Sequence, residues 1–155
     1  MNTKKVVLVV LIAFFCMSIQ AQSLKFNPDK KSEVELSWHG SSLNVGVSSN
    51  GGYKVSEFVF ETDKKLHVSL DDFNFDEVVD FAVWHTDDGM GTYTIFRVFV
   101  YDAKKGLFTE IFPSCGDEFI NLMVDKKKKI LESTYYDGNI PKQCVTSLST
   151  KTGSR

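Results

Sequence analysis

Side chains that carry oxygen recur at alternate positions in one acidic segment of the chain. Asp72, Asn74, Asp76 and Asp80 fall at places 1, 3, 5 and 9 of a calcium-loop pattern. Alternate residues of a tight loop can turn their oxygens toward one centre, and calcium prefers about six to eight oxygen ligands. The main-chain carbonyl of Val78 would add another. The spacing therefore predicts a structural calcium ion bound by Asp72, Asn74, Asp76, Val78 and Asp80.

The same segment departs from the calcium pattern at two places. Glu77 stands at the sixth place, where the sharp turn usually requires glycine, and Val83 stands where a bidentate glutamate would follow. A non-glycine residue in a left-handed conformation costs about 1 kcal/mol or more. The alternative is an acidic turn whose Asx side chains accept hydrogen bonds from backbone N–H groups. The sequence leaves both interpretations open.

A second acidic loop, HTDDGMG at residues 85–91, combines one histidine, two aspartates and two glycines. A histidine beside two carboxylates is a partial ligand set for a transition metal. Metal sites need several convergent ligands, so an ordinary exposed loop is the other interpretation.

No catalytic set accompanies these loops. The chain has three histidines, and no G-x-S-x-G motif surrounds a serine. Because nucleophile, base and metal roles cannot be assigned, we expect a protein that is not an enzyme. The net charge of −2 argues against a nucleic-acid binder, and the lysine run 126–129 lacks the arginine and stacking aromatics that such a site needs.

The elements that must position both loops are β-strands. Apolar and polar residues alternate with period two along 34–38, 43–47 and 66–70, which is typical of half-buried strands. Residues 78–84 and 92–101 are more continuously apolar, and turn sequences such as Ser49–Gly52 separate the segments. We expect an all-β fold, an antiparallel meander of about nine to ten strands arranged as a sandwich or a propeller-like structure, with an open barrel as the third arrangement. Further strands are expected at 119–124, 130–136 and 143–148.

The ends of the chain differ from its centre. Residues 1–21 carry two lysines, then an apolar run of about 12 residues, then Ala21, which is the order of a secretory signal peptide. The run is shorter than the roughly 20 residues of a membrane-spanning helix, and a retained short anchor is the alternative. Removal of residues 1–21 would bring the net charge from −2 to −4. We expect one β domain at 22–148, a flexible tail at 149–155, a periplasmic, secreted or cell-surface location, and no transmembrane segment after cleavage.

Two cysteines, Cys115 and Cys144, follow the predicted signal. In an oxidising exported compartment such a pair indicates one disulfide, and two free buried thiols are the alternative. Their spacing matches neither a CxxC redox motif nor a zinc site.

The acidic motif and the segments that follow it in the chain resemble a family of bacterial exported immunity proteins. The resemblance rests on residues 72–80, on Gly89-Met90-Gly91, on the aromatic strand from Tyr93 to Asp102, and on Gly106-Leu107-Phe108. It covers roughly residues 58–136, and Glu77 departs from the glycine of the family motif. It implies a small all-β fold, partly propeller-like, that neutralises a lysozyme-like peptidoglycan hydrolase delivered by a secretion system.

We therefore expect an exported immunity protein, stabilised by calcium, that binds and blocks such a hydrolase. Rigid loops at 85–91 and 48–53 would enter the hydrolase cleft. The alternative is a calcium-stabilised extracellular adhesion or glycan-binding module, in which sugars stack on exposed Trp38, Tyr53 or Tyr136. The partner-binding residues expected for the immunity protein are His85, Asp87, Asp88, Met90 and Tyr53.

Overall fold

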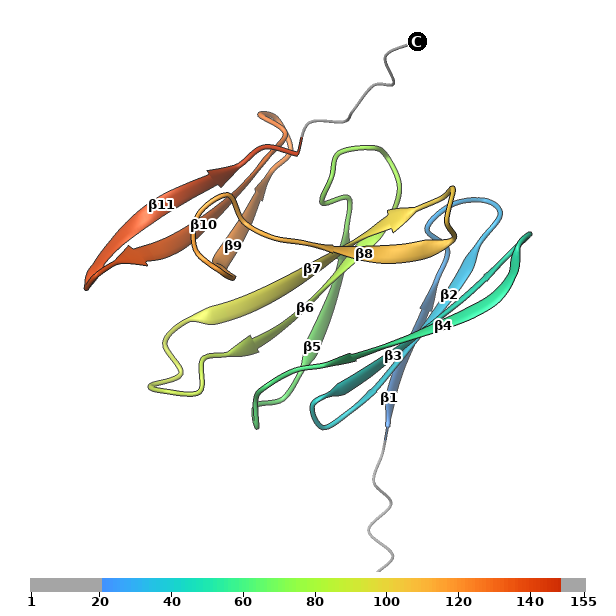
Figure 1. The fold of residues 1–155 in the computed structure, drawn as a ribbon, viewed down its shortest axis with the longest axis horizontal. Coiled ribbons are helices and arrows are strands. Elements are labelled where there is room, and N and C mark those ends of the chain that lie inside the picture. The colour runs from blue at the N-terminus through green and yellow to red at the C-terminus, as the bar shows by residue number, and fades with distance from the viewer. Residues whose placement is uncertain (1–20, 149–155) are drawn as a thin grey trace, which may run out of the picture.

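Eleven β-strands make up the regular structure of the computed structural model, which describes residues 21–148 (Figure 1). Within that range the chain forms no helix, so no helix there is long and apolar enough to span a membrane. The strands are β1 (Gln22–Phe26), β2 (Glu33–His39), β3 (Ser42–Ser49), β4 (Gly52–Val59), β5 (His67–Asp71), β6 (Asp80–Thr86), β7 (Thr94–Asp102), β8 (Leu107–Ile111), β9 (Phe119–Asp125), β10 (Ile130–Asp137) and β11 (Ile140–Thr146).

The first sheet is an antiparallel meander in the order β1-β2-β3-β4. Its inner face carries the alternating apolar residues of β2 and β3, because successive side chains of a strand point to opposite faces. Leu36 pairs with Val45 in the β2–β3 register, and both are fully buried. The alternation in the sequence therefore marks the face that the sandwich buries.

The second sheet has the order β11-β10-β9-β7-β6-β5, and β8 also pairs with β7. One edge of β7 pairs with β6 along most of its length. Its other edge pairs first with β9, at Ile95 and Phe96, and then with β8 from Val98 to Asp102. The chain between β8 and β9 consequently leaves the sheet and returns to it beside the start of β7.

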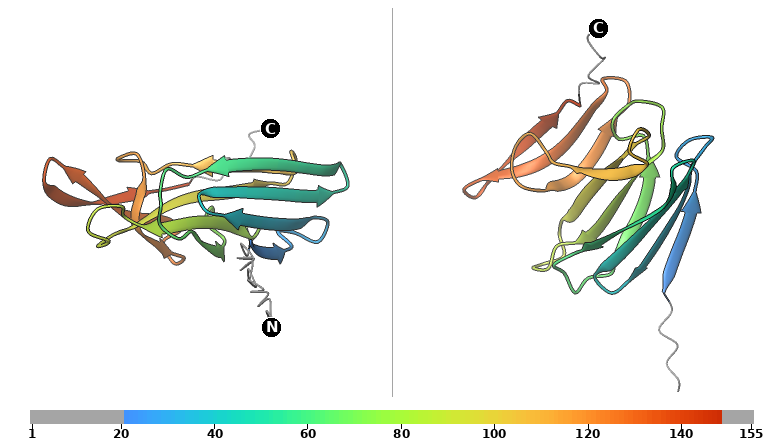
Figure 2. Two further views of the ribbon diagram at one scale, coloured as in Figure 1. Left: turned by 90° about the horizontal axis from the view of Figure 1, so that it is seen from below. Right: turned by 45° about the vertical axis from the view of Figure 1, so that its right-hand side comes forward.

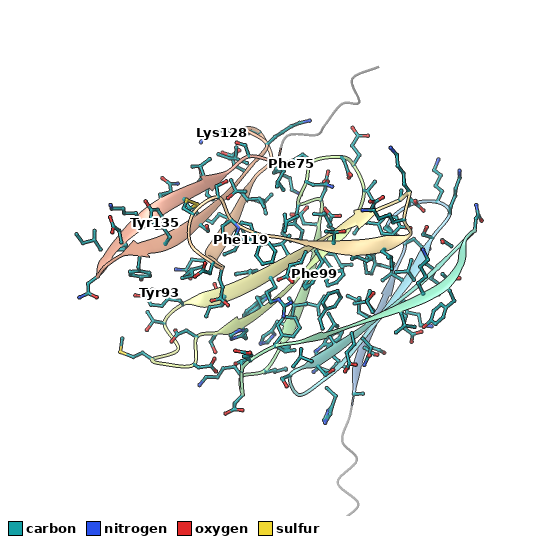
Figure 3. All side chains as sticks on the ribbon, in the orientation of Figure 1. Phe75, Tyr93, Phe99, Phe119, Lys128 and Tyr135 are labelled. Carbon is teal, nitrogen blue, oxygen red and sulfur yellow. A yellow bond between two sulfur atoms is a disulfide. The ribbon has the colours of Figure 1, made fainter. Side chains whose placement is uncertain are left out.

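The main hydrophobic core lies between the two sheets. Phe99 on β7 stacks on Phe81 of β6 with ring centroids 4.8 Å apart. Phe58 of the first sheet packs against the Phe99 ring, with 4.6 Å between the two centroids. Figure 3 shows Phe99 in this interior and Phe119 at the start of β9. Contacts between aromatic rings of this kind add about 0.5–1.5 kcal/mol beyond the burial of their area.

A second, smaller core lies on the other face of the second sheet. Phe73, Ala82 and Phe119 are buried there. Strand β6 therefore has buried side chains on both faces, which explains its continuous apolar sequence. Strands β9–β11 project beyond the edge of the first sheet (Figure 2).

The expected all-β antiparallel architecture is confirmed, and the two sheets form a sandwich and no closed barrel. Eleven strands replace the expected nine or ten. The unexpected strands are β1, β4 and β8, each at a sheet edge, where exposure weakens the apolar alternation that indicates a strand. The predicted signal peptide, except for Ala21, and the predicted tail at 149–155 lie outside the described residues.

The predicted disulfide between Cys115 and Cys144 is confirmed. It joins the segment before β9 to β11, with 5.9 Å between the two Cα atoms and 29 residues of sequence separation. Cys144 is fully buried, so the bond fixes the β9–β11 region to the chain that leaves β8.

Removal of this bond should lower the free energy of unfolding. For a closed loop of this length the chain-entropy treatment gives about 3–4 kcal/mol. We expect the Cys115→Ser, Cys144→Ser double variant to unfold at a correspondingly lower urea concentration than the oxidised chain. Equal urea midpoints for the two proteins would contradict this expectation.

Candidate functional site

The loop between β6 and β7, residues 87–93, is ordered by one carboxylate. Asp87 accepts backbone N–H bonds from Gly89 at 3.0 Å, Gly91 at 3.3 Å, Thr92 at 2.6 Å and Tyr93 at 2.8 Å. These bonds, that from Tyr93 foremost, hold the pKa of Asp87 below its ordinary value. A loop organised in this way keeps its shape although it is exposed.

The tip of the 87–93 loop presents an apolar side chain to solvent. Met90 is 89% exposed, the largest exposure among the large apolar side chains of residues 21–148. Beside it Asp88 accepts a 2.7 Å hydrogen bond from the Thr62 hydroxyl, which ties the loop to the segment between β4 and β5. The loop lies at one end of the sandwich (Figures 1 and 2).

An open cavity of about 530 Å³ adjoins this loop, and we call it the acidic cavity. Apolar residues line part of it, among them Phe60, Ile95 and Phe96. Its charged lining has five carboxylates and one guanidinium group, contributed by Glu61, Asp88, Arg97, Glu110, Asp117 and Glu118.

The one arginine of the acidic cavity is neutralised by its neighbours. Arg97 donates from Nε and Nη2 to the two carboxylate oxygens of Glu110, both at 2.7 Å, and from Nη1 to the Val59 carbonyl at 2.8 Å. Its guanidinium carbon lies 4.5 Å above the centre of the Phe60 ring. Four carboxylates are left without a cationic partner among residues 21–148, so the cavity favours a cationic ligand.

His85 lies at the end of β6 and lines the acidic cavity with 9% of its surface exposed. Its Nδ1 is 2.8 Å from the Thr86 carbonyl oxygen. Because a carbonyl can only accept, Nδ1 carries the proton in this bond. Within residues 21–148 no group of three or more histidine, cysteine, aspartate or glutamate side chains is arranged to hold a metal ion, so the transition-metal ligand set considered for residues 85–91 does not form there.

The predicted partner-binding residues separate into two groups. His85, Asp87, Asp88 and Met90 gather at the 87–93 loop and the acidic cavity. Tyr53 lies elsewhere, on the first sheet: its ring covers Gly46, and it is 67% exposed. Two surfaces therefore carry the residues that the sequence assigned to one role.

The acidic loop at residues 72–80 closes the β5–β6 hairpin with hydrogen bonds inside the loop. Asp72 accepts from the N–H groups of Asp76 at 3.1 Å and Glu77 at 2.9 Å, and Asp76 accepts from that of Val78 at 2.9 Å. Glu77 has φ +69°, so the sharp turn expected at the sixth place forms without glycine. The bond to Asp72 stabilises that left-handed residue.

Asp80 is fully buried at the end of this loop and accepts hydrogen bonds from the backbone of the loop and of β7. Its oxygens accept N–H bonds from Phe73 at 3.0 Å and Tyr101 at 2.8 Å. Burial raises the pKa of Asp80 to about 7, against the lowering effect of those two N–H donors, and the nearby Asp76 charge adds to the rise.

The side-chain oxygens of Asp72, Asn74, Asp76 and Asp80 therefore accept hydrogen bonds from backbone N–H groups, which is the Asx-turn alternative. Within residues 21–148 no three acidic, histidine or cysteine side chains are arranged to hold one ion. The order of the loop is accounted for by its own hydrogen bonds. Calcium binding by this loop stays a prediction, and the function proposed below does not depend on it.

The sequence did not indicate the acidic cavity. Its carboxylates come from the β4–β5 segment, the 87–93 loop, β8 and the β8–β9 segment, which are far apart in the chain. The Arg97–Glu110 pair results from the antiparallel pairing of β7 with β8, and the local residue pattern did not indicate that pairing.

Comparison with protein-family models, with curated proteins and with solved structures finds no match to this chain.

The stability of the chain should depend on pH through Asp80. Its pKa of about 7 exceeds the ordinary 3.8, so the folded chain holds this proton more tightly than the unfolded chain does. The resulting stabilisation is complete below about pH 4 and is lost as the pH rises through about 7. Relative to Asp80→Asn, the unchanged chain should lose on the order of 4 kcal/mol of unfolding free energy across that window. Urea unfolding of both proteins over this range measures the difference, and parallel curves would contradict it.

Calcium binding has a thermodynamic signature that needs no functional assay. An ion that binds only the folded chain adds about 2.7 kcal/mol of stability at a hundred times its dissociation constant. The prediction requires added calcium to raise the melting temperature and the Asp76→Ser variant to lose that increase. Identical melting curves in calcium and in chelator would refute it.

Proposed function

We propose that this chain is an exported inhibitor that binds a basic peptidoglycan hydrolase of the lysozyme type and blocks its cleft. The observation that carries the proposal is the 87–93 loop, an exposed segment held in one shape by four N–H bonds to Asp87. A rigid loop loses little conformational entropy on binding, which favours affinity. It is therefore suited to enter a cleft in another protein.

The apolar tip and the charge around it fit such a partner. Met90 offers an exposed apolar side chain that a cleft can bury. The unpaired carboxylates of the acidic cavity next to it would attract a basic hydrolase and orient its approach. A cationic segment at the rim of the hydrolase cleft would then occupy the acidic cavity while the loop enters the cleft.

Export of the chain is part of the proposal. The disulfide between Cys115 and Cys144 supports it, since such bonds persist in oxidising compartments. The sequence order of residues 1–21 supports it independently. Peptidoglycan hydrolases act in the same compartment.

The alternative, a glycan-binding module built on stacking aromatics, has one supporting observation. Trp38 lines a cavity of about 310 Å³, and its buried Nε1 has no hydrogen-bond partner in the described part of the chain. Tyr53 lies on the open outer face of the first sheet, and Tyr136 packs edge-on against Tyr93 at 5.7 Å. Binding to a panel of neutral oligosaccharides without inhibition of hydrolases would favour this alternative.

Inhibition assays with lysozyme-type hydrolases test the leading proposal. We expect Met90→Lys to raise the inhibition constant by about 30-fold or more, the effect of losing a central contact of about 2 kcal/mol. Asp87→Ala should weaken inhibition as well, because the loop loses its four N–H acceptor bonds.

The matched control is Met123→Lys, which places the same charge on β9, where the methionine is 60% exposed. It should leave inhibition unchanged. Equal effects of the two methionine variants, or no inhibition of any hydrolase in the panel, would contradict the proposal.

A further inference from the structure

Three turns enclose a second open cavity, of about 520 Å³, which we call the lysine pocket. The β1–β2, β3–β4 and β7–β8 turns meet there, at the end of the sandwich opposite the 87–93 loop (Figures 1 and 2). It is lined by Asp29, Lys30, Lys31, Ser32, Ser49, Asn50, Gly51, Lys54, Ala103, Lys104, Lys105 and Gly106.

The charge of this pocket contrasts with that of the whole chain. Five of the 18 Lys and Arg residues line it, although the chain carries a net charge of −2. Asp29 is its one acidic lining residue, and Asp102 nearby pairs with Lys105 at 3.1 Å. Lys30, Lys31 and Lys104 form no ion pair within residues 21–148. The pocket therefore keeps an excess of positive charge that an anion would neutralise.

The turns that carry the lysines are fixed to one another. Lys54 Nζ donates to the Lys105 carbonyl at 2.6 Å, which joins the start of β4 to the β7–β8 turn. The Tyr101 hydroxyl donates to Ser32 Oγ at 2.8 Å and so holds the β1–β2 turn against β7. Gly106 of the β7–β8 turn has φ +60°, and a Cβ there would lie 3.2 Å from Ser49 Oγ at the end of β3. The β7–β8 turn therefore contacts the β3–β4 turn. The pocket thus has a defined shape and differs from a set of separate solvated turns.

The lining distinguishes between classes of anion. It contains no arginine and no aromatic ring, so it lacks the groups that stack on bases in nucleic-acid sites. It has no large apolar residue, whereas proteins that dock on membranes combine lysines with apolar anchors. Lysine ammonium groups act as point charges that suit anionic groups spaced along a flexible polymer.

We propose that the lysine pocket binds an anionic glycan, a sugar chain that bears sulfate, phosphate or carboxylate groups. Such binding would hold an exported protein on a polyanionic surface while the opposite end stays free. The proposal does not rest on the inhibitor function, because it uses none of the residues of the 87–93 loop or the acidic cavity.

A sulfated heparin hexasaccharide is a suitable probe, and its binding to the full chain can be measured by calorimetry. The pocket variant is Lys30→Gln, Lys104→Gln. The matched control is Lys127→Gln, Lys129→Gln, which removes the same charge from the lysine turn between β9 and β10. We expect the pocket variant to bind about tenfold more weakly at physiological salt, since two counterion-releasing contacts are lost. The control should bind as the unchanged chain does.

Further probes separate the sources of the anion. An uncharged dextran hexasaccharide should not bind, and inorganic phosphate should compete far more weakly than the hexasaccharide. Equal loss in both lysine variants would reduce the effect to general charge attraction and overturn the proposal. Absence of heparin binding would also overturn it. Binding to phosphatidylglycerol vesicles in place of heparin would assign the pocket to a membrane surface instead.

Discussion

The buried carboxyl group of Asp80 connects the acidic loop to β7 through its hydrogen bonds, and the rest of the structure depends on this connection. It is buried, and it accepts N–H bonds from Phe73 in the acidic loop and from Tyr101 at the end of β7. Tyr101 in turn bonds to Ser32, which belongs to the first sheet's β1–β2 turn. One buried group therefore connects the acidic loop, the second sheet and the turn that forms part of the lysine pocket. Its loss would leave two buried N–H groups without partners.

The sandwich separates two surfaces of opposite charge. The 87–93 loop, which borders the acidic cavity, lies at one end, and the turns that line the lysine pocket lie at the other (Figure 1). The small net charge of the chain hides this division, because the two sets of charge nearly cancel. The proposed inhibitor could be held on an anionic glycan by its lysine pocket. Its 87–93 loop, at the opposite end, would then stay free to contact a basic hydrolase. Turns contribute to both surfaces, and the sheets hold those turns in place.

Local patterns predicted the fold well, and contacts between distant segments explain what they missed. The alternation of apolar and polar residues along β2 and β3 correctly predicted which face of the first sheet is buried. The presence of two cysteines correctly predicted the disulfide bond. Glu77, where the motif has glycine, nevertheless adopts the left-handed conformation of the sixth place. The sequence could not tell whether the aspartates of this loop face an ion or backbone N–H groups, since both uses need the same residues at the same spacing. The two charged cavities depend on which segments meet in space, and that follows from sheet order and register.

We propose that the 87–93 loop and the acidic cavity form the surface that contacts a hydrolase. Amide hydrogen exchange of the chain, measured alone and with a lysozyme-type hydrolase, can locate the contact surface. We expect added protection in the 87–93 loop and in the β8–β9 segment that borders the cavity, with unchanged exchange at the turns of the lysine pocket. Protection confined to the outer face of the first sheet, or to the lysine pocket, would contradict it.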